Sequence, residues 1–167
     1  SMFTQEGEVV RLAENYGEGE SSLLVERYAL DTGKLIAQQG VDSTLRALCA
    51  YKDGKYLALV QPVPGPEDME APMTQIAVYD PATGGTTLVA TLNGSYLNNV
   101  TYDPQSDTAY YCCDATIYAV PLATGESRVS AYLPVNAWSG SDTTFGALSG
   151  GMIVYANGDG AYVRRLD

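Results

Sequence analysis

The sequence contains no histidine, and its basic residues are few: 9 Lys and Arg stand against 20 Asp and Glu in 167 residues. Histidine is the side chain that most often acts as a general base near neutral pH, and it is the commonest metal ligand. Its absence argues against most zinc sites and against Ser-His-Asp catalysis. The formal net charge is −11, and the one adjacent basic pair is Arg164-Arg165. Because nucleic-acid binding requires clustered cations, we expect no nucleic-acid partner.

Cysteines and long apolar runs are also scarce. The three cysteines, Cys49, Cys112 and Cys113, have no C-x-x-C spacing. An odd count without that spacing indicates neither a zinc site nor a disulfide framework, so we interpret them as small buried residues and expect no metal site. Cys112 and Cys113 are adjacent and should point to opposite faces of a strand. No run approaches the roughly 20 apolar residues of a membrane-spanning helix, and we expect no membrane span.

What the sequence does contain is a repeat around the dipeptide Thr-Gly. It follows an apolar strand end at Thr32-Gly33, at Thr83-Gly84 and at Thr124-Gly125. The second and third threonines lie 41 residues apart, and the first and second lie 51 apart. One Pro-rich insertion, Pro62–Pro72, accounts for the extra length. A recurring period of this size indicates a repeat architecture.

Each repeat contains four short segments rich in β-branched residues and tyrosine, separated by turn residues, as antiparallel meanders require. In the centre of the chain the predicted strands are 45–51, 55–61, 75–79 and 86–92, followed by 97–102, 108–113, 116–120 and 127–133. Residues 2–8 align with 49–55. Near the other end, the segments that match the first three strands are 144–148, 152–156 and 161–166.

This repeat predicts an all-β fold: a β-propeller with four-stranded antiparallel blades, about four repeats in all, the terminal ones incomplete. The approximate blades are 2–40, 44–92, 97–133 and 144–167, in a single partial domain. A helical fold is disfavoured, because Gly and Pro interrupt every candidate window. A sandwich or open barrel could share the strand spacing, but would not predict a repeat of about 42 residues.

Two segments, Ile76–Gly84 and Ile117–Gly125, end a strand and continue into the Thr-Gly turn. In this pattern the chain resembles repeats of the quinoprotein-like and YVTN-like propeller families. Such propellers often occur in secreted or lipid-anchored bacterial envelope proteins, including modules attached to solute-binding domains. The resemblance therefore implies a fragment of a larger bacterial protein, located outside the cell or in the cell envelope. The tryptophans that dock blades in quinoprotein repeats are missing here, so we expect no cofactor.

Candidate ligand residues lie in loops that join the second strand to the third, or one blade to the next, because propeller geometry places both kinds on one face. The insertion Pro62–Pro72 has four prolines and three carboxylates, among them Glu67 and Asp68. It could bind a cation or a basic partner, since an extended Pro-rich segment loses little entropy when ordered. The alternative is a solvated insertion without a role.

A second candidate is the loop Pro134–Asp142, which holds the one tryptophan of the sequence, Trp138. With Asn136 and Asp142 it could stack against a sugar ring and bind its hydroxyls. The alternative is that Trp138 folds back over a blade edge. Tyr96, in the between-blade loop 93–97, completes the set of candidate ligand residues.

The sequence thus favours a non-enzymatic binding module whose partner is a small solute, a glycan or a protein domain. No catalytic residue is predicted. The alternative is a fragment of a propeller enzyme, a hydrolase or lyase, whose catalytic residues lie mainly outside this segment. A spacer made of blades is a third hypothesis. Two copies could also pair through their blade edges, because exposed edge strands tend to find partners.

Overall fold

The computed structural model describes residues 1–17, 21–97, 99–132, 144–148, 152–157 and 160–165. In these residues every regular element is a β-strand, and the strands form four antiparallel sheets in which each strand pairs with the next along the chain. No helix that could cross a membrane occurs in the part of the chain that the structure describes.

Three sheets have four strands each. The first sheet contains β1 (Met2–Gln5), β2 (Glu8–Tyr16), β3 (Ser21–Ala29) and β4 (Leu35–Val41). The second contains β5 (Leu45–Ala50), β6 (Tyr56–Val60), β7 (Gln75–Tyr79) and β8 (Thr86–Thr91). The third contains β9 (Val100–Asp103), β10 (Thr108–Cys113), β11 (Thr116–Pro121) and β12 (Arg128–Tyr132). The fourth has three strands among the described residues, β13 (Thr144–Leu148), β14 (Met152–Asn157) and β15 (Gly160–Arg165).

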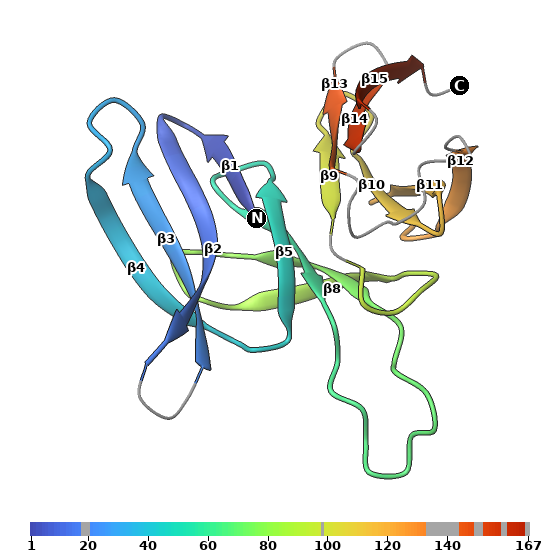
Figure 1. Ribbon diagram of the computed structural model, residues 1–167, viewed down its shortest axis with the longest axis horizontal. Helices are drawn as coiled ribbons and strands as arrows, with labels where there is room; N and C mark the ends of the chain where they lie inside the picture. The colour runs from blue at the N-terminus through green and yellow to red at the C-terminus, as the bar shows by residue number, and fades with distance from the viewer. Residues whose placement is uncertain (18–20, 98, 133–143, 149–151, 158–159, 166–167) are drawn as a thin grey trace.

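The first strands of the four sheets lie next to one another in chain order. β1 contacts β5, β5 contacts β9, and β9 contacts β13. The sheets therefore follow one another around an arc, as Figure 1 shows. This arrangement is that of propeller blades, and it confirms the predicted fold class.

The Thr-Gly repeat corresponds to the turn between the third and fourth strands of a sheet. Gly33, Gly84 and Gly125 have φ angles of 68°, 75° and 69°, in the left-handed region that favours glycine. In each case the glycine N–H donates to the carbonyl oxygen of the residue four positions earlier. The same short turn therefore recurs in three sheets, which is the physical reason for the repeated dipeptide.

Most of the hydrophobic core lies between neighbouring sheets. β6 contributes Tyr56, Leu57, Ala58 and Leu59, each at most 2% exposed. Leu57 and Leu59 join a cluster toward the third sheet that includes Ile76, Leu92, Tyr111 and Val120. Tyr56 and Ala58 join a cluster toward the first sheet that includes Val10, Val25 and Tyr79. Because alternate residues of a strand point to opposite faces, β6 belongs to two cores at once.

The cysteines are free thiols in this structure. Cys112 packs with Tyr110 and Ile117 on one face of the third sheet, whereas Cys113 lies against the cluster on the other face. Their predicted orientation to opposite faces is therefore correct. Burial raises the pKa of Cys49 to about 12 and that of Cys112 to about 11, so both thiols stay protonated at neutral pH.

One strand begins later than the sequence predicted. The first strand of the third sheet was expected from residue 97, but β9 begins at Val100. Tyr96 has a φ of 55°, and the N–H of Leu97 donates to Thr74 Oγ1, 3.4 Å away, so the chain is still in its loop there. Leu97 instead fills the core between the second and third sheets.

The turn between β10 and β11 contains an alanine in an unfavourable conformation. Asp114 and Ala115 have φ angles of 48° and 59°, whereas two other turns with two consecutive positive φ angles, between β1 and β2 and between β5 and β6, place Gly7 and Gly54 at the second position. We expect Ala115→Gly to raise the free energy of unfolding by about 1 kcal/mol, because glycine adopts this conformation without the steric cost. Urea denaturation measures the change.

Ala123→Gly is the matched control, since Ala123 is exposed in a turn and does not have a positive φ. This substitution should lower the free energy of unfolding by about 0.5–1 kcal/mol, through the greater entropy of the unfolded chain. Equal destabilisation by both substitutions would contradict the assignment of strain to Ala115.

Candidate functional site

The insertion 62–72, here called the Pro-rich arm, connects β6 to β7 and projects away from the sheets (Figure 1). A turn closes its outer part: the N–H of Asp68 donates to the carbonyl oxygen of Gly65 at 3.1 Å. The N–H of Gly65 in return donates to a carboxylate oxygen of Asp68. Pro66 occupies the second position of this turn, where its fixed φ is favourable. The arm therefore has a defined shape at its outer part.

The base of the arm is held by a buried glutamine. Gln61 is 2% exposed, and its Nε2 donates to the carbonyl oxygen of Pro72 at 2.6 Å. Its Oε1 accepts from Thr74 Oγ1 at 2.8 Å and from the N–H of Tyr96 at 2.7 Å. Both lone pairs of Oε1 are thus used. One side chain links the two ends of the arm to the loop that leads into the third sheet.

Further hydrogen bonds connect the arm to that loop. Ser95 Oγ lies 3.0 Å from the carbonyl oxygens of both Ala71 and Pro72. The N–H of Thr74 donates to the carbonyl oxygen of Gly94 at 2.8 Å. Buried hydrogen bonds of this kind fix one arrangement, because every alternative leaves polar groups unpaired. The arm and the loop 93–97 therefore form one rigid surface.

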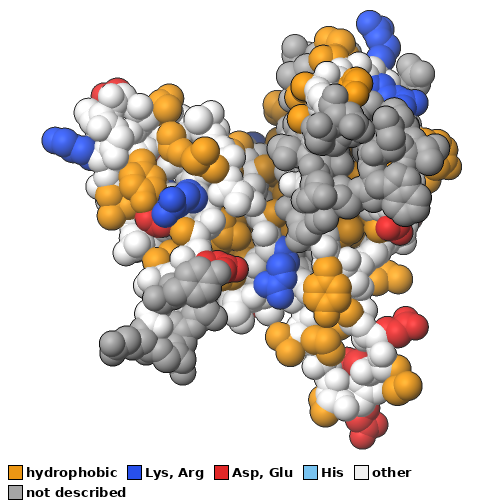
Figure 2. All heavy atoms as spheres, in the orientation of Figure 1, with side chains coloured by type: hydrophobic (Ala, Val, Ile, Leu, Met, Phe, Trp, Pro, Cys, Tyr) orange, Lys and Arg blue, Asp and Glu red, His pale blue; other side chains and the backbone are white. Residues whose placement is uncertain are grey.

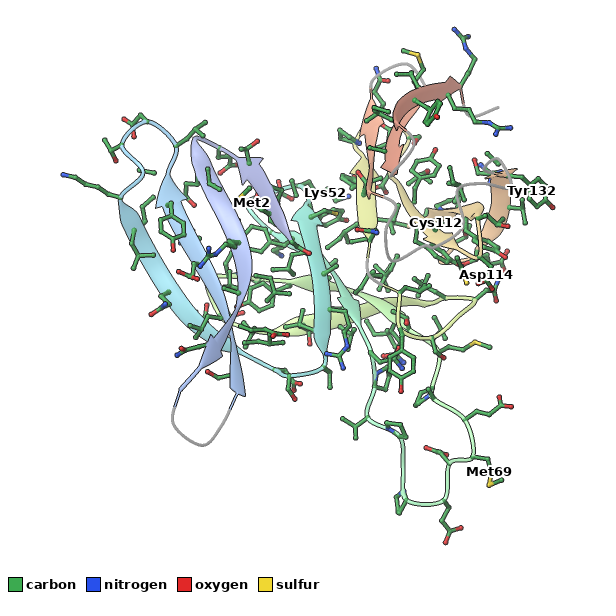
Figure 3. The ribbon with its side chains drawn as sticks, viewed as in Figure 1. Met2, Lys52, Met69, Cys112, Asp114 and Tyr132 are labelled. Carbon is green, nitrogen blue, oxygen red and sulfur yellow. The ribbon has the colours of Figure 1, made fainter. Side chains whose placement is uncertain are left out.

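This surface exposes apolar and acidic side chains together. Met69 is 97% exposed, Val63 is 73% exposed and Tyr96 is 59% exposed. The carboxylates of Glu67 and Glu70 are exposed as well. Figure 3 shows Met69 near the end of the arm, pointing away from the protein, and Figure 2 shows apolar and acidic groups along it. The surface is convex, with a rigid backbone and accessible side chains.

The structure describes three of the six candidate residues named from the sequence, and all three belong to the arm or to the loop tied to its base. Glu67 and Asp68 lie in the turn of the arm, and Tyr96 is tied to its base through its backbone N–H. One oxygen of Asp68 is occupied by the N–H of Gly65, so Asp68 has a local structural role as well. The other three candidates, Asn136, Trp138 and Asp142, lie outside the described residues. Within the described ranges, no group of His, Cys, Asp and Glu is arranged to hold a metal ion.

A pocket that the sequence analysis missed lies at the opposite ends of β6 and β7. It has a volume of about 230 Å³ and lies between the first and second sheets, with Glu8, Arg27 and Tyr56 in its wall. The hairpin register could have placed Glu8 near Arg27. No local pattern could have placed Tyr56 beside them, because this contact depends on how two sheets pack.

Three solved structures share this arrangement of sheets. A chain of Kuenenia stuttgartiensis hydrazine synthase gives a TM-score of 0.60 at 14% identity, over 96% of this chain and 56% of that chain. A chain of a nidogen–laminin complex gives 0.59 at 12% identity, over 87% and 55%. The β-propeller domain of the trilobed protease from Pyrococcus furiosus gives 0.56 at 11% identity, over 92% and 46%.

The chain has a β-propeller fold. It spans about half of the length of each of these similar chains. No protein-family model matches the sequence, and no curated protein sequence matches it. Identities this low show the fold alone, because one fold serves many functions. The resemblance to the quinoprotein-like and YVTN-like families therefore remains a prediction from the sequence.

Removing the glutamine at the base of the arm should destabilise the protein. Gln61→Leu keeps a similar volume but leaves the Thr74 hydroxyl, the Tyr96 N–H and the Pro72 carbonyl without this partner. We expect a loss of about 2–4 kcal/mol in the free energy of unfolding, because each buried polar group loses its hydrogen bond. Urea denaturation measures it, and limited proteolysis should show faster cleavage within the arm.

Gln38→Leu serves as the control, since Gln38 is exposed on β4. It should change the free energy of unfolding by no more than about 0.5 kcal/mol. If Gln61→Leu were as mild as this control, the hydrogen bonds at the base of the arm would contribute nothing to stability.

Proposed function

We propose that this chain is a binding module of propeller fold that recognises a protein partner through its Pro-rich arm. The observation that carries the proposal is the arm itself: a projecting segment with exposed Met69 and carboxylates, held rigid by the buried Gln61. The proposal includes a larger bacterial parent protein of the cell envelope or exterior, which rests on the sequence resemblance alone.

A rigid arm favours binding because little conformational freedom is lost when the partner docks. Met69 is flexible and polarisable, so it can adapt to an apolar recess on the partner. The carboxylates of Glu67 and Glu70 select a surface with Lys or Arg, and the net charge of −11 attracts such a partner over longer distances. The partner segment is therefore basic, with at least one apolar contact.

The convex shape distinguishes a protein partner from a small solute at this surface. Small molecules are bound in concave sites that cover most of their area, and a projecting arm offers no such cover. The glycan hypothesis depends on Trp138, and Trp138→Ala with glycan binding as the readout is its test. The hypothesis of a hydrolase or lyase fragment depends on residues of the parent protein outside this segment.

The charge preference of the arm can be tested with a displayed library of random peptides of about 12 residues. We expect selection on the wild-type chain to enrich peptides with a positive net charge. An enriched peptide should bind Glu67→Gln/Glu70→Gln about fivefold more weakly, because two exposed charge pairs are lost. Fluorescence polarisation at low salt measures the affinity, and added salt should weaken wild-type binding.

The matched control is Asp31→Asn/Glu126→Gln, which removes two exposed carboxylates from turns at the opposite ends of the strands. It should leave the peptide affinity within about a factor of two of the wild-type value. Enriched peptides without positive charge, or an equal loss in both double variants, would overturn the assignment of the partner to the arm.

A second copy of the chain is also a candidate partner. Side chains on the two end sheets are exposed: Met2 in the first sheet is 71% exposed, and Val163 in the fourth is 62% exposed. Two chains that cover each other's end sheets would bury these side chains and shield the exposed strand edges from other partners. Light scattering after size exclusion should then give twice the chain mass of 17.8 kDa. A monomeric mass would contradict the pairing.

A further inference from the structure

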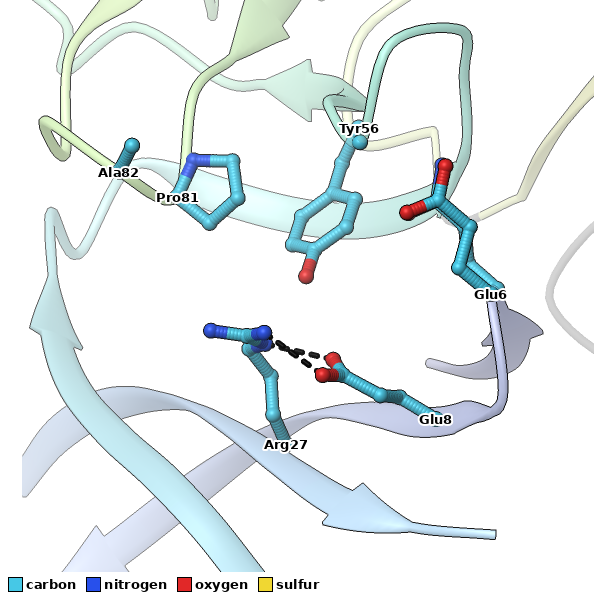
Figure 4. A pocket seen from close by; sticks show the side chains of 8 residues that line it. Glu6, Glu8, Arg27, Tyr56, Pro81 and Ala82 are labelled. Atoms are coloured by element: carbon cyan, nitrogen blue, oxygen red, sulfur yellow. Dashed lines mark hydrogen bonds and ion pairs between the residues drawn. The ribbon is translucent and has the colours of Figure 1, made fainter.

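The pocket between the first and second sheets is a separate site, at the end of β6 away from the arm. Its wall includes Glu6 and Glu8 at the turn from β1 to β2, Arg27 near the end of β3, and Tyr56 at the start of β6. Pro81, in the turn after β7, adds an apolar side. Figure 4 shows these side chains around the space, with Pro81 and Glu6 on opposite sides of Tyr56.

Arg27 and Glu8 form a fixed pair in this wall. Arg27 Nε lies 2.7 Å from Glu8 Oε2, and Arg27 Nη2 lies 2.7 Å from Glu8 Oε1. This bidentate geometry is stronger than a single hydrogen bond between a guanidinium and a carboxylate. The hydrogen bond that Arg27 donates to Glu8 is the main reason that the pKa of Arg27 is raised. The pair is neutral as a whole, yet it leaves carboxylate lone pairs available to the pocket.

Tyr56 brings a hydroxyl group to the pocket. The residue is 2% exposed, and its hydroxyl points toward Arg27 and Glu8 (Figure 4). The structure gives this hydroxyl no hydrogen bond to any of the described residues. Burial raises the pKa of Tyr56, so the hydroxyl keeps its proton at neutral pH. Among the described residues no fully buried polar side-chain atom lacks a partner, so this hydroxyl is open to the pocket, where it can bind water or a ligand.

Glu6 determines the charge that the pocket prefers. Its carboxylate makes no ion pair in the described part of the chain, and it is close enough to Tyr56 to raise the pKa of that hydroxyl. Glu6, Glu8 and Arg27 together carry one net negative charge. Glu6 is held by the tight turn that it shares with Gly7, with φ angles of 50° and 77°. The pocket therefore favours a cation over an anion.

The size of the pocket limits the ligand. Its volume of about 230 Å³ is below the range of roughly 300–1,000 Å³ found for sites of drug-sized molecules. A primary ammonium group has three N–H donors, which matches the acceptors of Glu6, Glu8 and Tyr56. The apolar part of such a compound would lie toward Pro81, on the side of Tyr56 opposite to Glu6 (Figure 4).

We propose that this pocket binds a small primary ammonium compound, with its ammonium group on Glu6, Glu8 and the Tyr56 hydroxyl and its short apolar body along Pro81. The site is independent of the Pro-rich arm, because it lies at the other end of β6 and uses none of its residues. The failure of one proposal therefore leaves the other standing.

The test is a titration of the ¹⁵N-labelled chain with n-butylammonium chloride, followed by NMR chemical shifts. Sodium butyrate and n-butanol are the matched probes of opposite and zero charge. We expect saturable shifts at amides near the pocket, such as those of Gly54 and Ala82, with n-butylammonium alone. Glu6→Gln should weaken binding about tenfold and Tyr56→Phe about fivefold, through the loss of a charge and of a hydroxyl acceptor.

Glu126→Gln is the control, since it removes one exposed carboxylate far from the pocket along the sequence and in another sheet. It should leave the affinity for n-butylammonium unchanged. The amide spectrum of each variant shows directly whether the chain is folded. Three outcomes overturn the proposal: no saturable shift with n-butylammonium, an equal response to butyrate or butanol, or the same loss in Glu126→Gln as in Glu6→Gln.

Discussion

The packing of the first and third sheets against β6, a strand of the second sheet, is the constraint on which the rest of the structure depends. Leu57 and Leu59 face the third sheet, while Tyr56 and Ala58 face the first, and all four are buried. Burial of one large apolar side chain contributes about 1.5–3 kcal/mol. A shift of β6 by one residue would exchange its two faces and put Tyr56 and Ala58 where Leu57 and Leu59 now pack, so close packing on both faces opposes it. β6 therefore holds three sheets in one arrangement.

Both proposed sites lie at the ends of this strand. Tyr56, its first residue, presents its ring to the core and its hydroxyl to the pocket. Gln61, the residue after its last, anchors the Pro-rich arm. A side chain that acts in a site must be held by its surroundings, and here the two buried faces of β6 do this. The rigidity of each site is thus a consequence of the core.

The sequence was sufficient where the determining interactions are local. The Thr-Gly turn depends on one glycine with a positive φ, and the strands depend on alternation and turn residues, so the repeat and the fold class were predictable. The arm was recognised from its prolines for the same reason. The sequence did not identify Gln61 as the anchor of the arm, because Gln61 acts through Thr74 and Tyr96, which are distant along the chain. The start of β9 was placed too early because these same bonds hold Leu97 in the loop.

The shared strand does not imply that the two sites influence one another. Coupling between sites requires an element with two arrangements whose balance both ligands change. β6 has one arrangement, since close packing on both faces leaves Leu57 and Leu59 no alternative position. The convex arm suits a macromolecule and the pocket a small cation, so the two ligands also do not compete for the same space. We therefore expect each to bind with the same affinity whether or not the other is present.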